Sequence, residues 1–215
     1  SGFGFETAKQ AVRYFEAAGV AVIARVPSKD YDQIARIADM GAEGIMLPMV
    51  NNAAEARQIL DCLKYIPDGK RGVALGVAHD NYTRTGVVAD RLKAANKRTT
   101  LFCQIETAEG VENADAMAAL DGVDCLWVGH FDLSCSLGIP GEFGHKKFTS
   151  AIDKVVKATR KHGKALGRLV PNVETGVEYN KWGFDFICYS GDVWLLQSAL
   201  SSGIEQLRKV CVAQK

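Results

Sequence analysis

Apolar and polar positions follow two alternating patterns along most of the chain, one typical of amphipathic helices and one typical of buried strands. In residues 6–18, Ala8, Ala11 and Phe15 recur at the spacing of one helical face, and Gly19 follows where a left-handed cap residue is expected. In the last such segment the apolar face consists of leucine, isoleucine and alanine side chains, which we expect to pack inward. The pattern predicts further helices over residues 30–40, 52–64, 110–120, 147–162, 173–182 and 192–208.

Short apolar runs lie between these helices, over residues 20–26, 44–50, 101–106, 123–129, 165–170 and 184–190. Continuous apolar runs are typical of parallel strands covered on both faces. Strands that alternate with helices indicate an α/β fold. Residues 66–100 break the alternation with several glycines and a proline, so we expect a long functional loop there, with one helix near 86–96.

Two α/β architectures fit this order: an open doubly wound sheet, or a (β/α)8 barrel lacking its first two strands. Barrels average about 250 residues, and about 40 more residues would supply two strand–helix units. The sequence has 215 residues and starts at Ser1 with a helical pattern almost at once, so we expect it to be part of something longer. We expect residues 1–215 to form a single barrel domain.

Composition narrows the classes of protein that fit. Hydrophobic residues make up 47% and charged residues 24% of the chain, which excludes an intrinsically disordered protein. The net charge of +1 gives no global attraction to nucleic acid or to an anionic membrane, and no apolar run approaches the roughly 18 residues of a membrane helix. None of the six cysteines forms a CxxC pair, and no export leader is visible, so we expect a cytoplasmic protein.

Polar side chains at the carboxyl ends of the predicted strands are the candidate functional residues, because active sites of both architectures lie there. Glu106 ends one strand and Asp132 follows the next, so their carboxylates should lie near each other. Such a pair fits a hard divalent cation held by oxygen ligands. Alternatively, each carboxylate caps a helix or pairs with an arginine. Gln104 lies on the same strand face as Glu106, which favours a shared polar site.

Three further residues each leave two interpretations open. Arg25 ends an apolar strand, so it either meets a substrate carboxylate or enolate oxygen or forms a structural ion pair. Asp39, on a helix just before Gly41, fits a solvated or capping role by pattern alone. His130, beside Asp132, fits a local hydrogen-bonding role better than a catalytic one. No lysine ends a strand, which disfavours a Schiff-base aldolase.

Three segments together resemble a known family. QIET (104–107), GVDCLWVGHFDLSCSLGIPG (122–141) and RVPSKDYDQIARIADMGAEGIMLPMV (25–50) are similar to the HpcH/HpaI aldolases, the metal-dependent class II pyruvate aldolases related to citrate lyase. The resemblance covers essentially the whole chain. It implies a (β/α)8 TIM barrel, here without its first two strands. It also implies a carbon–carbon lyase that uses a divalent cation, with Mg²⁺ as the expected ion and Mn²⁺ or Co²⁺ as alternatives.

The resemblance also implies roles for the matching residues. Glu106 and Asp132 match the two metal-ligating carboxylates, and Arg25 matches the arginine that steadies the keto or enolate oxygen of pyruvate. Asp39 matches an aspartate that supports the base histidine. In the substrate pocket, the main-chain N–H groups of Phe131 and Asp132 match those that bind the pyruvate carboxylate. Leu169 matches an apolar wall residue, and Gln104 matches a polar residue of the same pocket.

The chain departs from the family pattern in two places. His130 and Phe131 stand where most relatives have Pro-Ser or a similar pair. The general base of the family lies in a D-x-E-H motif at the end of the second strand, and the sequence does not contain that motif. The base histidine should therefore lie just before Ser1.

The implied reaction is reversible aldol cleavage of a 4-hydroxy-2-oxo acid into pyruvate and an aldehyde. The aldehyde stays open between succinic semialdehyde, tartronate semialdehyde, glycolaldehyde and lactaldehyde. The resemblance implies a homo-oligomer, commonly a hexamer, with small-molecule substrates and neither nucleic acid nor membrane as partners. The alternatives are a non-catalytic fragment or pseudoenzyme that keeps a metal and carboxylate pocket, or a citrate-lyase-type carbon–carbon lyase.

Overall fold

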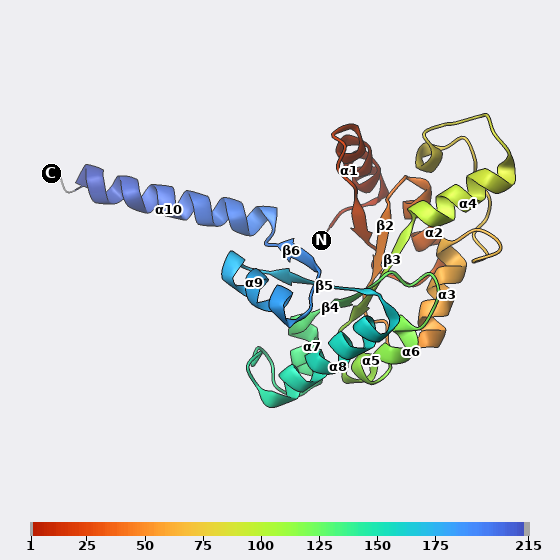
Figure 1. The fold of residues 1–215 in the computed structure, drawn as a ribbon. Helices are drawn as coiled ribbons and strands as arrows, with labels where there is room; N and C mark the ends of the chain where they lie inside the picture. Colours follow the sequence, from red (N-terminus) through yellow and green to blue (C-terminus); the bar gives the residue numbers. More distant parts are fainter. Residues whose placement is uncertain (1, 213–215) are drawn as a thin grey trace.

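The structure is a computed structural model that describes residues 2–212. Its centre is one sheet in which each strand pairs in parallel with the next along the chain (Figure 1). A doubly wound sheet reverses its strand order at a switch point, and this sheet does not. The predicted α/β class is confirmed, as a six-stranded part of a TIM barrel. The strands are β1 (Ile23–Arg25), β2 (Gly44–Leu47), β3 (Thr100–Ile105), β4 (Cys125–Val128), β5 (Ala165–Val170) and β6 (Phe186–Tyr189).

Helices follow the strands and cover the outer face of the sheet (Figure 1). This outer layer holds most of the core, with Ile34 of α2, Leu60 of α3, Met117 of α6 and Phe148 of α8 fully buried against the strands. Burial of each such side chain is worth about 1.5–3 kcal/mol. The helices are α1 (Phe5–Ala17), α2 (Tyr31–Asp39), α3 (Ala53–Leu63), α4 (Val88–Arg98), α5 (Ala108–Glu112), α6 (Ala114–Ala118), α7 (His130–Ser136), α8 (Lys146–His162), α9 (Val173–Trp182) and α10 (Asp192–Val212), with a 3-10 turn η1 (Ala78–Asp80).

The inner face of the sheet carries a smaller apolar cluster. Met46, Phe102, Cys125 and Trp127 are buried there, and the ring of Phe186 meets those of Phe102 and Trp127 edge-on at 5.3 and 5.8 Å. Alternate residues of a strand point to opposite faces, so this cluster marks the interior of the partial barrel. Gln104 and Glu106 continue the same inward series along β3 towards its carboxyl end.

The expected elements differ from the observed ones mainly at their ends. The apolar runs 20–26 and 44–50 extend beyond the residues that pair in the sheet, so the strands there are shorter. The expected helix 110–120 is divided into α5 and α6 at Asn113, whose side chain donates to the Asn51 carbonyl at 3.0 Å. Helix α7 was not among the expected helices, because the glycines and proline that follow it dominate the local pattern.

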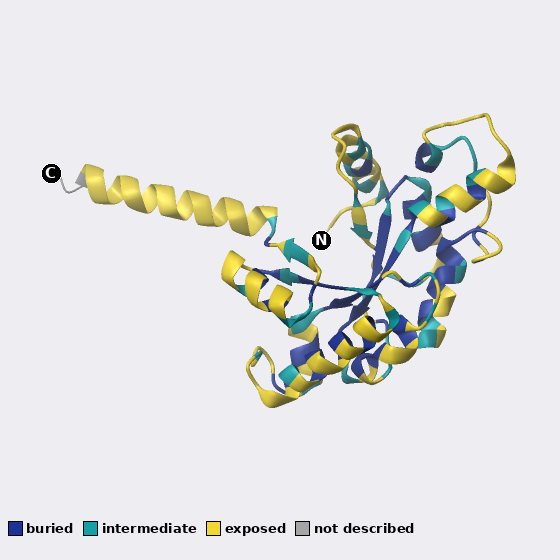
Figure 2. Cartoon of the chain, in the orientation of Figure 1, coloured by how far each residue is buried: buried dark blue, intermediate teal, exposed yellow. Residues whose placement is uncertain are grey.

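The expected inward packing of the last helix is wrong. Helix α10 extends away from the rest of the molecule, and Figure 2 shows its surface exposed. Leu196 and Leu200 on its apolar face are 62% and 55% exposed. Helical periodicity identifies an apolar face but not the surface that covers it, and no other segment of residues 2–212 covers this one. None of the helices described is both long enough and apolar enough to cross a membrane.

Candidate functional site

The carboxylate of Glu106 is the centre of the candidate site. Glu106 follows β3 directly and is only 4% exposed. Its Oε2 accepts a hydrogen bond from the Met49 backbone N–H at 2.9 Å, and its Oε1 accepts one from the Gln104 amide at 2.7 Å. Met49 follows β2 in the left-handed region, at φ 54°. Two neighbouring strand ends therefore hold this carboxylate in place.

The third strand end contributes Gly129 and Asp132. The Gly129 N–H donates to the Ile105 carbonyl at 3.0 Å, which ties the start of α7 to the end of β3. A Cβ atom at Gly129 would lie 2.5 Å from both Cγ and Oε1 of Glu106, so only glycine leaves room for that side chain. Asp132 lies in the first turn of α7 and is exposed to solvent.

The electrostatics show that the predicted carboxylate pair comes together. Burial raises the pKa of Glu106 above its ordinary value, and the negative charge of Asp132 raises it further. The hydrogen bond from Met49 and the positive charge of Arg25 act in the opposite direction on this pKa. Glu106, Asp132 and Arg25 therefore lie near enough to interact, as their positions at strand ends predicted.

The donor set fits a hard divalent cation. Among residues 2–212, no cluster of three or more histidine, cysteine, aspartate or glutamate side chains could hold a metal. Two carboxylates can still hold Mg²⁺ or Mn²⁺ when water or substrate oxygens complete the coordination. The Oε1 atom of Gln104 is buried beside Glu106 and has no hydrogen-bond partner in the part of the chain that the structure describes. The site is therefore rich in oxygen ligands but supplies too few to fill the coordination shell of a cation. Such a site leaves coordination positions open for water or substrate.

Arg25 ends β1 with an exposed side chain. It forms no ion pair with any carboxylate in the part of the chain that the structure describes. Of the two interpretations of this arginine, the geometry favours an anion-facing role over a structural ion pair. The same strand lines a cavity of about 590 Å³ together with residues of α1 and α2.

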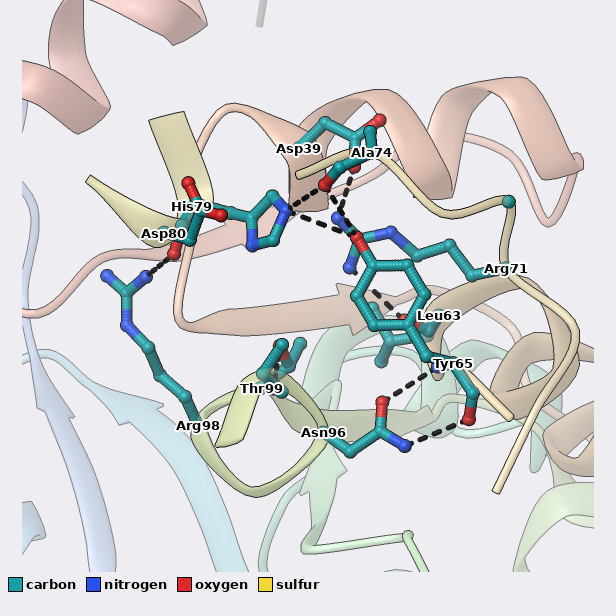
Figure 3. A network of polar contacts seen from close by, with 12 residues as sticks. Asp39, Leu63, Tyr65, Arg71, Ala74, His79, Asp80, Asn96, Arg98 and Thr99 are labelled. Carbon is teal, nitrogen blue, oxygen red and sulfur yellow. Dashed lines mark hydrogen bonds and ion pairs between the residues drawn. The ribbon is translucent and has the colours of Figure 1, made fainter. Parts of the chain in front are cut away.

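Asp39 belongs to a separate polar network (Figure 3). It ends α2 and pairs with Arg71, whose side chain is almost fully buried. The Arg71 guanidinium lies 4.5 Å from the ring centre of Tyr65, and the Tyr65 hydroxyl lies 3.2 Å from Nε2 of His79. Asp39 is therefore held by an ion pair rather than simply solvated. Sequence reasoning missed Arg71 and Tyr65, because they lie in or beside the irregular segment, which has no periodic pattern.

Phe131 and Leu169 line a second cavity of about 790 Å³ at the ends of β4, β5 and β6. His130 lines it as well, and burial lowers the pKa of His130 to about 4, with the charge of Arg168 as the second cause. His130 is thus a neutral imidazole at pH 7. Phe131 is 62% exposed at the rim, so the pair at 130–131 shapes the mouth of this cavity.

The sequence matches a known protein family over residues 4–199, described as HpcH/HpaI aldolase/citrate lyase. It is 36% identical to a hydroxypyruvate/pyruvate aldolase of Chromohalobacter salexigens, over 87% of this chain and 73% of that protein. It is 34% identical to a 5-keto-4-deoxy-D-glucarate aldolase of Shigella boydii, over 88% of this chain and 72% of that protein.

The fold also matches solved structures. The crystal structure of the HpcH/HpaI aldolase from Desulfitobacterium hafniense superposes with a TM-score of 0.90 at 30% sequence identity, over 97% of this chain and 80% of that one. Sequence and fold agree with each other and with the strand-end carboxylates. The chain therefore belongs to the HpcH/HpaI aldolase/citrate lyase family and is a carbon–carbon lyase of the pyruvate aldolase class.

Proposed function

We propose that this protein catalyses the reversible aldol cleavage of a 4-hydroxy-2-oxo acid into pyruvate and an aldehyde, with Mg²⁺ as the preferred cation. The observation that carries the proposal is the pair Glu106 and Asp132, one buried and one exposed, at consecutive strand ends. The family is metal-dependent. Two relatives are named as a hydroxypyruvate/pyruvate aldolase and a 5-keto-4-deoxy-D-glucarate aldolase, which supports the same substrate class.

Glu106 and Asp132 would hold the cation, with Gln104 orienting the Glu106 carboxylate by its hydrogen bond. A divalent cation bound there supplies Lewis-acid charge at the keto oxygen of pyruvate. Arg25 adds a second positive charge at the same end of the sheet, where negative charge develops on that oxygen. Its exposed guanidinium, which forms no ion pair within residues 2–212, supports this role.

The pyruvate carboxylate would bind to the main-chain N–H groups of Phe131 and Asp132. The first N–H groups of a helix have no acceptor within that helix, and these two residues lie in the first turn of α7. Leu169 on β5 would form an apolar wall beside the methyl group. Asp39 would support the base, and the ion pair with Arg71 holds its carboxylate in place.

The test is proton–deuterium exchange at the methyl group of pyruvate, followed by NMR with Mg²⁺ or Mn²⁺ and then with a chelator. We expect exchange that depends on the metal. Exchange requires the enolate that forms when the methyl proton is removed, and the cation would stabilise the negative charge on its oxygen. Failure to bind either metal or pyruvate would contradict the proposal. Binding without exchange would support the non-catalytic alternative, in which the pocket is present and the base is not.

We also propose that the protein is a homo-oligomer. The support is the apolar face of α10, which no segment of residues 2–212 covers. A second copy of the chain would bury this face. The hexamer implied by the family is one closed assembly that does so.

A further inference from the structure

Arg168 is a buried cation beside the second cavity. It lies near the carboxyl end of β5 and is only 3% exposed. Its neighbour Leu169 points to the inner face of the partial barrel, so Arg168 points outward, towards α9. No ion pair in residues 2–212 includes Arg168.

The described contacts of the guanidinium involve one of its faces and its Nε atom. One face stacks on Tyr179 of α9, with the central carbon 3.6 Å from the ring centre. The Nε atom donates to the Leu169 carbonyl at 3.1 Å. The Nη1 atom is buried and has no hydrogen-bond partner among the described residues. Leaving a buried donor of a charged group unpaired destabilises the folded state. Arg168 therefore either destabilises the fold or belongs to a ligand-binding site.

The surroundings of Arg168 favour a ligand-binding site. Arg168 lines the cavity of about 790 Å³, a volume within the usual range for small-molecule pockets. His130 and Phe131 line the same cavity from the start of α7, and Leu169 lines it from β5. The cavity is therefore lined both by residues proposed to hold pyruvate and by Arg168.

The charges in this cavity select the class of ligand. The carboxylate in its lining belongs to Glu178, which is exposed; its charge acts on Arg168, but the two groups form no ion pair in residues 2–212. His130 contributes a ring and Phe131, Leu169 and Trp194 contribute apolar surface. Apolar and aromatic surface beside a guanidinium fits a small molecule with an apolar or neutral body and a terminal carboxylate.

We propose that Arg168 binds the terminal carboxylate of the aldehyde substrate and so determines specificity for acidic semialdehydes. The inference rests on the proposed aldolase function for the reacting end of the molecule. It assigns the far end of the substrate to the Arg168 cavity, defined by Arg168, Tyr179, His130, Phe131 and Leu169. Neutral aldehydes of similar length would offer the guanidinium no anion and would react poorly.

The kinetic test compares succinic semialdehyde with pentanal, a neutral aldehyde of similar length, each added to pyruvate. We expect wild-type kcat/KM to be about 10- to 100-fold higher for succinic semialdehyde, as charge-assisted hydrogen bonds imply. Arg168→Met should remove most of this preference, while kcat/KM for pentanal and methyl exchange of pyruvate stay within about threefold. Arg168→Lys, which keeps the charge but not the paired donors, should keep part of the preference. Arg160→Met is the control, because Arg160 is an exposed arginine that donates to Trp182 and does not line the cavity.

A binding measurement separates this proposal from the proposed function. Trp182 and Trp194 line the cavity, so succinate should change tryptophan fluorescence in wild type even with chelator and without pyruvate. Loss of that change in Arg168→Met, with circular dichroism showing a folded variant, would support the site whether or not the protein exchanges pyruvate protons. No response to succinate in wild type, an unchanged response in Arg168→Met, or an equal fall in reactivity with both aldehydes would overturn the inference.

Discussion

Glu106 shows how one residue acquires its chemistry from its neighbours. Two hydrogen bonds orient its carboxylate, while burial and Asp132 raise its pKa. A cation between the two carboxylates would relieve both effects. We predict that Glu106→Gln weakens Mn²⁺ binding by more than about 100-fold, because loss of an outer-shell partner alone costs 10–100-fold. Calorimetry measures this affinity, and Glu109→Gln, on the exposed side of α5, is the matched control. Unchanged affinity in Glu106→Gln would remove this residue from the ligand set.

Gly129 is required by a close approach rather than by an unusual backbone angle. Its φ of −85° suits any residue, but a Cβ there would lie 2.5 Å from Glu106. We predict that Gly129→Ala destabilises the protein by about 1–3 kcal/mol, as overpacking does, and also reduces metal-dependent exchange of pyruvate protons. Thermal unfolding and NMR measure the two effects. Gly144→Ala, where a Cβ would meet nothing within 4 Å, should change neither. If both variants behaved alike, the crowding argument would fail.

Asp80 links stability to pH. Burial alone would raise the pKa of Asp80, but the Gly76 N–H at 2.9 Å and the Arg91 guanidinium lower it below its ordinary value. A lowered folded-state pKa contributes stability above the ordinary value of about 4, and this contribution is lost as pH falls through the folded-state value. We predict that Asp80→Asn lowers the melting temperature at pH 7 and that the difference from wild type narrows at about pH 3. Asp90→Asn, an exposed position, is the control. A constant difference across this range would contradict the linkage.

At the scale of elements, helix α9 depends on the residue that precedes it. Asn172 caps it, accepting a hydrogen bond from the Thr175 N–H at 2.8 Å, and α9 carries the Tyr179 ring that stacks on Arg168. We predict that Asn172→Ala lowers the free energy of unfolding by about 1 kcal/mol, the usual contribution of such a cap. Asn172→Asp keeps an acceptor at the same position and should restore most of the loss. Denaturant unfolding of the three proteins measures the effect; equal stability of all three would show that the cap is dispensable.

The regular elements were predictable because each depends on local periodicity. The helix 147–162 and the strand 165–170 were expected almost as they are observed. Helix α7 was missed because its start is decided by contacts between distant segments, including the hydrogen bond from Gly129 to Ile105. The division between α5 and α6 has the same kind of cause, in the contact of Asn113 with Asn51.

For the whole molecule, the exposed face of α10 is the feature that a single copy leaves unexplained. Burial of Leu200 and Leu207 against a second copy would be worth about 1.5–3 kcal/mol for each side chain. We predict that Leu200→Lys with Leu207→Lys shifts the protein to a smaller mass in sedimentation, with circular dichroism showing that it stays folded. Ser202→Lys adds charge on the opposite side of the same helix and should not change the mass. A wild-type monomer would contradict the proposed oligomer directly.

The sequence by itself determined the α/β class, the order of helices and strands along the chain, and the family, because these depend on periodicity and on motifs such as QIET. It also placed Arg25, Glu106 and Asp132 at one edge, since parallel strands have their carboxyl ends together. Only the tertiary structure decided what surrounds those groups. The ion pair of Asp39 with Arg71 and the burial of Arg168 against Tyr179 join residues from different elements. Such contacts are set by the packing of helices on the sheet, and no local pattern encodes which distant side chain will fill a given space.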